Sequence, residues 1–159
     1  MQPNSAKQIF DFFPGVWKIA RWVTAEIPAQ NAIAHGYGLF TVSKENPCLI
    51  LYSEKVTLHT LQSHTTHIGK QQYQYIYDMA NASLSKHFYD GRLLYRFNLL
   101  DGQINGAHLC IQDRYVSKYI FEADRFSVVY MVDGPLKSYS ITSVYTPIPN
   151  NNCIKKLLF

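Results

Sequence analysis

The sequence predicts an all-β protein: a single antiparallel up-and-down β-barrel of about nine or ten strands, preceded by a short helical turn. Aromatic residues, mainly 12 Tyr and 9 Phe, make up 14% of the 159 residues, and aromatic side chains favour strands. Short runs of alternating apolar and polar residues recur along the chain, separated by turn residues such as Asp90-Gly91 and Asp101-Gly102. No long helical pattern interrupts these runs, and a meander that closes into a barrel leaves no exposed strand edges.

The N-terminal segment from Ser5 to Phe12 is expected to form the helical turn, with Ser5 as its N-cap. Pro14-Gly15 ends that turn. The first strand is expected from Val16 to Thr24, and its alternation places four side chains on one face: Trp17, Ile19, Arg21 and Val23. We expect Trp17 to be buried at one end of the barrel, near Phe13 and the end of the last strand.

The second strand is expected from Ile33 to Val42 and carries Gly36 and Gly38 on one face. Glycines at such positions indicate a sharp bend or a close approach of backbones. The remaining strands are expected at residues 49–58, 72–77, 83–89, 92–99, 103–110, 114–121, 126–132 and 137–146. We expect the last strand to pair with the first, because closing a meander joins its ends.

One domain is expected over residues 1–146, followed by a tail at 147–159 in which Pro147 and Pro149 end the strand pattern. The apolar residues of the tail favour docking on the barrel, with a free tail as the alternative. A β-sandwich is the alternative fold. The regular spacing of the turns and the lack of a Cys-Trp-Cys pattern favour the barrel.

Composition excludes several classes of protein. The net charge is +4 and the basic residues are scattered, which argues against a nucleic-acid partner. No apolar run is long enough to span a membrane as a helix. Three cysteines without Cys-x-x-Cys spacing, and no signal-peptide pattern, predict neither a disulfide framework nor a Cys-rich zinc site, and indicate a cytoplasmic protein.

Gly15-x-Trp17 at the start of the first strand resembles the Gly-x-Trp signature of lipocalins and other calycin barrels. Between about residues 10 and 146 the chain resembles a family of lipocalin-like bacterial proteins of unknown function. The motifs that carry this resemblance are Gly15-x-Trp17-x-x-x-Arg21, Gly36-x-Gly38-x-Phe40, Tyr52-x-Glu54, Phe88-Tyr89-Asp90-Gly91-Arg92, His108-x-Cys110-x-x-Asp113-x-Tyr115 and Gly134-Pro135-x-Lys137-x-Tyr139. The resemblance implies a calycin barrel and no established activity.

Strand alternation also predicts which polar side chains point into the barrel. The candidate ligand-binding residues are Arg21, Glu54, His108, Asp113, Tyr115, Lys137 and Tyr139. In one interpretation Arg21, Lys137 and the tyrosines form a clamp for a ligand carboxylate or phosphate. In the other, the charged residues form an internal salt-bridge network, such as Arg21 with Glu54 or Asp113 with Lys137.

His108, Cys110 and Asp113 are all potential metal ligands, but no second His or Cys pair lies near them in sequence, so we predict a structural role and no metal. A haem-binding calycin would need one axial His inside the barrel, and His108 is the first choice, although no cofactor is predicted. Three further histidines, His59, His64 and His67, are expected on an exposed loop or strand edge. The stripe of Tyr73, Tyr75 and Tyr77 predicts packing, with stacking on a planar ligand as the alternative.

These observations favour a binding protein that holds a small amphipathic molecule inside the barrel, an anionic one if the clamp interpretation holds. An enzyme that uses the same cavity, with His108, Asp113 and Tyr115 as acid–base groups, is the first alternative. A filled barrel that interacts with other proteins is the second. No nucleophile elbow, phosphate-binding loop or dinucleotide fingerprint is present.

Overall fold

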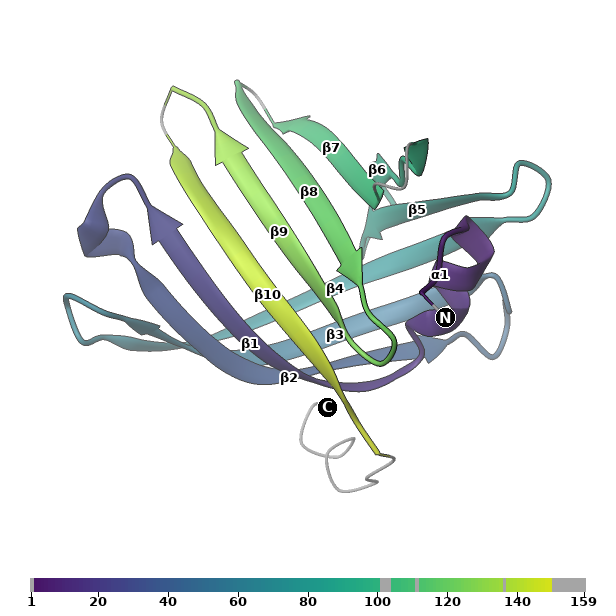
Figure 1. The fold of residues 1–159 in the computed structure, drawn as a ribbon, viewed down its shortest axis with the longest axis horizontal. Helices are drawn as coiled ribbons and strands as arrows, with labels where there is room; N and C mark the ends of the chain where they lie inside the picture. The colour runs from purple at the N-terminus through teal and green to yellow at the C-terminus, as the bar shows by residue number, and fades with distance from the viewer. Residues whose placement is uncertain (1, 101–103, 111, 136, 150–159) are drawn as a thin grey trace.

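Ten antiparallel strands form one sheet that curls into a nearly closed barrel, which confirms the predicted all-β fold (Figure 1). This computed structural model describes residues 2–100, 104–110, 112–135 and 137–149. The elements are α1 (Ala6–Phe12), β1 (Gly15–Ala25), the 3-10 turn η1 (Pro28–Gln30), β2 (Ala32–Val42), β3 (Leu49–Thr60), β4 (Thr66–Asp78), β5 (Ser83–Phe88), β6 (Leu93–Arg96), β7 (Ile104–Cys110), β8 (Asp113–Phe121), β9 (Phe126–Asp133) and β10 (Ser138–Ile148).

The strands follow an up-and-down order in which each pairs with its neighbours in sequence, except β6 with β7, and β10 pairs with β1 as expected. The register of that pair places Arg21 opposite Ser143 and Val23 opposite Ile141. β6 and β7 are joined in the described residues by one isolated bridge, between Asn98 and Asn105. The barrel therefore has one weakly paired seam.

Strand boundaries differ from the sequence-based expectation at several places. β4 begins at Thr66 rather than near residue 72. The sequence pattern missed its first part because residues 66–72 are almost all exposed and show no alternation of apolar and polar side chains. β6 is shorter than expected, and β10 continues past Pro147 to Ile148. The turn predicted at Asp101-Gly102 and the tail residues 150–159 lie outside the described residues.

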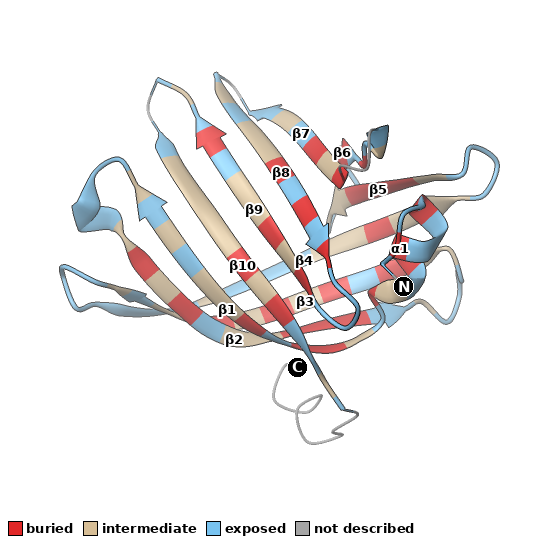
Figure 2. Ribbon diagram, viewed as in Figure 1, coloured by how far each residue is buried: buried red, intermediate tan, exposed pale blue. Residues whose placement is uncertain are grey.

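The short helix α1 covers one end of the barrel. Its N-cap is Ser5, whose hydroxyl accepts a hydrogen bond from the backbone N–H of Gln8. Ile9 and Phe10 are buried, and Figure 2 shows α1 beside buried positions of the surrounding strands. The fold therefore closes this end with apolar side chains and leaves polar chemistry to the other end.

Trp17 anchors the closed end, as the sequence predicts. The side chain is 4% exposed, and its Nε1 donates a hydrogen bond to the carbonyl oxygen of Phe13 at 2.8 Å. Its ring lies 5.0 Å from that of Phe126, which stacks in turn on Tyr145 at 4.3 Å. The start of the first strand and the end of the last are therefore held together by one aromatic cluster.

Two glycines of β2 allow the interior to fill closely. A Cβ on Gly36 would lie 2.0 Å from the carbonyl oxygen of Lys55, so the backbones of β2 and β3 approach each other there as expected. A Cβ on Gly38 would lie 3.0 Å from the ring of Tyr52, which packs directly over this glycine.

No helix in the described ranges is long and apolar enough to cross a membrane.

Candidate functional site

A cavity of about 350 Å³ lies inside the barrel. Arg21, far along β1 from α1, and Tyr139, at the start of β10, both line it, so the cavity occupies the part of the barrel away from the helix. Its walls carry six tyrosines, Tyr52, Tyr73, Tyr115, Tyr130, Tyr139 and Tyr145. Half of the 12 tyrosines of the sequence therefore line a cavity.

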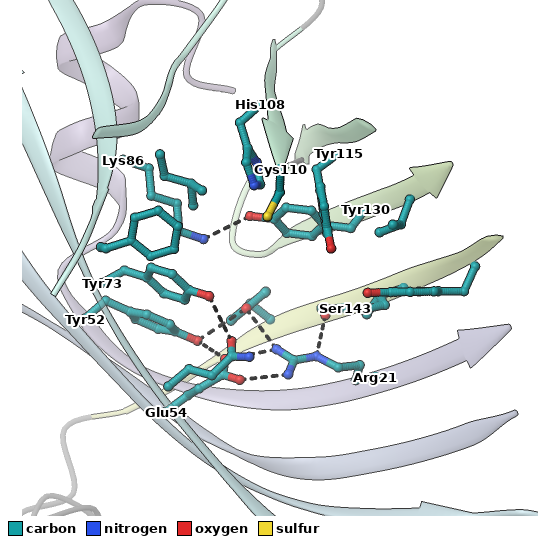
Figure 3. Close-up of a pocket in the computed structure, with 17 residues that line it drawn as sticks. Arg21, Tyr52, Glu54, Tyr73, Lys86, His108, Cys110, Tyr115, Tyr130 and Ser143 are labelled. Atoms are coloured by element: carbon teal, nitrogen blue, oxygen red, sulfur yellow. Dashed lines mark hydrogen bonds and ion pairs between the residues drawn. The ribbon is translucent and has the colours of Figure 1, made fainter. Parts of the chain in front are cut away.

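Five of the seven sequence-predicted residues line this cavity. They are Arg21, Glu54, His108, Tyr115 and Tyr139. The side chains come from β1, β3, β7, β8 and β10, so alternation along separate strands brings them to one interior. Figure 3 shows Arg21 and Glu54 facing each other on one side of the cavity, with His108 and Tyr115 on the other.

Lys137 and Asp113 are not brought into the cavity, contrary to expectation. Lys137 is exposed and precedes the first residue of β10, Ser138, so the alternation of that strand does not extend to it. Asp113 does not line the cavity; its Oδ1 is buried, without a hydrogen-bond partner in the described residues, and packs against the backbone of Gly134. No Asp113–Lys137 ion pair is found in the described residues.

Arg21 and Glu54 form a bidentate ion pair. Nη1 of Arg21 donates to Oε1 of Glu54 at 2.7 Å, and Nη2 donates to Oε2 at 2.9 Å. Nε of Arg21 donates to the hydroxyl of Ser143 at 2.7 Å, and the hydroxyl of Tyr52 donates to Oε2 of Glu54. The contacts therefore support the interpretation of an internal salt bridge, because the guanidinium of Arg21 is already paired with Glu54 and Ser143.

The electrostatics of the pair follow from this geometry. Burial would raise the pKa of Glu54, but the hydrogen bonds and charge of Arg21 hold that pKa below its usual value. Burial opposes the charge of Arg21, yet Tyr145 and Glu54 raise its pKa. Burial and the charge of Glu54 raise the pKa of Tyr145 to about 12. At neutral pH the pair is ionised and the tyrosine hydroxyl is neutral.

A second cation, Lys86 of β5, lies in the cavity and was not among the predicted site residues. The side chain is 5% exposed, and its Nζ donates a hydrogen bond to the hydroxyl of Tyr130 at 2.9 Å. The Nζ atom also lies 4.0 Å from the centre of the Tyr73 ring, within cation–π distance. The sequence contains a signal that the side chain points inward, because Lys86 falls on the same strand face as the apolar residues Leu84 and Phe88.

The hydroxyl of Tyr130 continues into a chain of tyrosines. The oxygens of Tyr130 and Tyr95 are 2.9 Å apart, and those of Tyr95 and Tyr119 are 2.6 Å apart. Because an ammonium can only donate, Tyr130 accepts from Lys86 and keeps its own hydrogen for Tyr95. Burial raises the pKa of all three phenols, which therefore stay neutral.

His108 lies on β7 with its ring stacked on that of Tyr115, the ring centres 4.6 Å apart and the planes inclined by 18°. Its Nδ1 atom is buried and has no hydrogen-bond partner among the described residues. Burial and the charge of Lys86 lower the pKa of this imidazole. His108 is therefore neutral at pH 7 and carries an unused hydrogen-bonding nitrogen.

The comparison with protein families settles which group the chain falls into. A family model described as a family of unknown function, DUF6314, matches residues 13–147. The chain belongs to this family. The matching family is of unknown function, as expected, but its model is not one of lipocalins. No curated protein matches the chain significantly.

The match to DUF6314 spans every residue that lines the cavity, from Arg21 to Tyr145. It begins at Phe13, so it excludes α1. The DUF6314 region of this chain is therefore the barrel itself together with its interior.

Metal binding finds no geometric support in the DUF6314 barrel. In the ranges that the structure describes, no three His, Cys, Asp or Glu side chains gather closely enough to hold an ion. His108 and Cys110 line the same cavity, but Asp113 does not join them. His59, His64 and His67 are exposed on the β3–β4 hairpin, as expected.

The tyrosine stripe of β4 divides between packing and cavity. Tyr75 is buried and packs on Phe13, the ring centres 5.0 Å apart. Tyr77 packs on Phe10, at 5.9 Å. Tyr73 lines the cavity and lies beneath Lys86. Packing is thus the role of two of the three rings.

Proposed function

We propose that this DUF6314 protein binds a small amphipathic molecule inside its barrel. The observation that carries the proposal is the cavity of about 350 Å³, whose size falls within the range of small-molecule sites. Its walls combine aromatic and aliphatic surface with a few fixed polar groups, and such a combination binds an apolar body and orients a polar end.

The architecture supports the same proposal. A nearly closed antiparallel barrel with a helix over one end is consistent with a calycin-like fold, and small barrels of this type hold one small ligand. The Arg21–Glu54 pair gives the cavity a rigid polar wall, because each partner is held by further hydrogen bonds from Ser143 and Tyr52. The site is thus organised before a ligand enters.

The enzyme alternative has weaker support. His108 and Tyr115 line the cavity and stack on each other, but Asp113 does not line it, so the three acid–base groups are not assembled. The filled-barrel alternative conflicts with the size of the cavity.

Native mass spectrometry tests the proposal, with the protein purified from cells that express it. We expect a retained species of small mass on the native protein and none on Ile141→Trp, because Ile141 lines the cavity and a larger ring would fill it. Met131→Trp is the matched control: Met131 is exposed on the adjacent strand β9, so its replacement should keep the ligand. Equal spectra for the two variants would contradict the proposal.

A further inference from the structure

The cavity contains one positive charge that the described residues do not neutralise. Arg21 and Glu54 cancel each other in their ion pair. Lys86 forms no ion pair with any carboxylate in the described part of the chain. Burying a lone charge is costly, so a charge retained in this position calls for a partner.

The surroundings of Lys86 stabilise a cation without neutralising it. Its Nζ lies over the ring of Tyr73 and within 6 Å of the rings of Tyr75, Tyr95 and Tyr130. Of the three N–H donors of the ammonium, one is used by the hydroxyl of Tyr130. Tyrosine rings and hydroxyls stay neutral here, so the net charge of +1 remains in the cavity.

A second unused group faces the same space. The imidazole of His108 lines the cavity together with Lys86, so one edge of the ring is available to a ligand. Figure 3 shows the imidazole pointing into the cavity from β7, on the side of Lys86 and Tyr130. Lys86 and His108 line the same cavity, and burial together with the charge of Lys86 lowers the pKa of the imidazole.

We propose that Lys86 and His108 form a subsite for the carboxylate group of the bound molecule. The proposal rests on the binding function proposed above and names the chemical class of the ligand. One carboxylate would supply the missing negative charge for Lys86 and an acceptor for a ring N–H of His108 that faces the cavity. Above about pH 7, where His108 is neutral, a doubly charged phosphate would instead leave an excess negative charge beside Glu54.

The anion site is therefore not the arginine that the sequence suggested. Arg21 already donates to Glu54 and Ser143, whereas Lys86 has donors to spare. The remaining walls of the cavity are largely aromatic, and its volume of about 350 Å³ admits a compact body. The ligand class that fits is a small, flat monocarboxylic acid.

Titration calorimetry with a matched pair of probes tests the subsite. Naphthoate and naphthamide have nearly the same shape, and only the first carries a charge. We expect the native protein to bind naphthoate about 10- to 100-fold more tightly than naphthamide, the range expected for hydrogen bonds to a charged group. Phenyl phosphate should bind more weakly than naphthoate.

Two variants locate the effect. Lys86→Met should abolish the preference for naphthoate while naphthamide still binds, which also shows that the variant is folded. Lys118→Met is the control, because Lys118 is an exposed lysine on β8 and its removal changes the net charge equally. Preserved preference in Lys86→Met would overturn the subsite.

Each remaining outcome also decides the proposal. Equal affinity of the native protein for naphthoate and naphthamide overturns the carboxylate subsite and leaves the binding function standing. If neither probe binds, the species retained in native mass spectrometry decides: a carboxylic acid lost in Lys86→Met supports the subsite, and a neutral or cationic molecule overturns it. If nothing is retained either, the binding function itself fails.

Discussion

Arg21 and Glu54 meet across a strand that belongs to neither of them. Arg21 lies on β1 and Glu54 on β3, and β2 runs between the two. The inward positions of β2 along this stretch are Ala34, Gly36 and Gly38, so no large side chain separates the guanidinium from the carboxylate. The glycines and the ion pair are thus one structural unit.

Removing Arg21 should destabilise the protein strongly. Arg21→Met leaves the 4%-exposed carboxylate of Glu54 without its cation, and loss of one partner of a buried pair costs about 3–5 kcal/mol. Urea unfolding measures the loss. The double variant Arg21→Met/Glu54→Leu should recover most of it, and a single variant as stable as the native protein would show that the pair does not support the fold.

Removing Lys86 should have the opposite outcome. Lys86→Met replaces an uncompensated buried charge by an apolar side chain of similar length, so the free energy of unfolding without ligand should stay within about 1 kcal/mol or rise. The same urea experiment measures it. A loss as large as that of Arg21→Met would mean that the four tyrosine rings around the Nζ of Lys86 need the cation for their own packing.

The Arg21–Glu54 pair should also make the protein sensitive to acid. The pKa of Glu54 is lower in the folded state than in the unfolded chain, so its contribution is fully present above the unfolded pKa of about 4.3 and is lost as pH falls through the folded pKa. Thermal unfolding between about pH 7 and pH 3 should show this loss. The double variant Arg21→Met/Glu54→Leu should show a shallower acid limb, and an unchanged limb would contradict the assignment.

Binding of naphthoate should take up protons. Burial and Lys86 lower the pKa of His108 in the free protein, whereas a carboxylate beside the ring would raise it, so affinity should increase from about pH 8 to about pH 5.5. The other ionisable side chains near the ring are Lys86 from β5, Tyr115 from β8 and Cys110 on its own strand. Calorimetry in buffers of different ionisation enthalpy measures the protons, and His108→Phe should remove the pH dependence. A flat affinity profile in the native protein would place the carboxylate away from His108.

Truncating the tryptophan at the closed end should be costly. Trp17→Ala removes a buried ring and its hydrogen bond to Phe13, with an expected loss of about 3–5 kcal/mol. Trp22→Ala is the matched control, since Trp22 is 47% exposed on the outer face of the same strand and should cost under about 1 kcal/mol. Equal midpoints of thermal unfolding for the two variants would contradict the placement of Trp17.

Strand alternation carried most of what the sequence could predict. It assigned Arg21 and Glu54 to the interior because each shares a strand face with a marker of the inner side, Trp17 or Tyr52. The strand of His108 has no such marker, so its inward placement was a prediction without one. It misplaced Lys137, which precedes its strand and does not share its alternation. Register was not readable, so the pairing of Arg21 with Glu54 over a third strand stayed one of two open interpretations.

Lys86 was overlooked for a different physical reason. A lysine on an inward position is ordinarily a sign that the strand is misassigned, since this residue type is rarely buried. Only the spatial gathering of tyrosines from β4, β6 and β9 around its Nζ makes the position tolerable. Such a cage comes from residues far apart in sequence, and no local pattern reveals it.

The seam between β6 and β7 has a consequence for how the chain folds. Strands β1 to β6 form one meander and strands β7 to β10 another, and within the described residues the backbone pairing between β6 and β7 is a single bridge, Asn98 to Asn105. In the described residues, the continuous strand pairing between the two meanders is that of β1 with β10, the two ends of the barrel sequence, and side chains such as Tyr95 and Tyr130 add hydrogen bonds across the seam. Because contacts between distant parts of a chain slow folding, this pairing should form late, and the rate of barrel closure should depend on it more than on any hairpin.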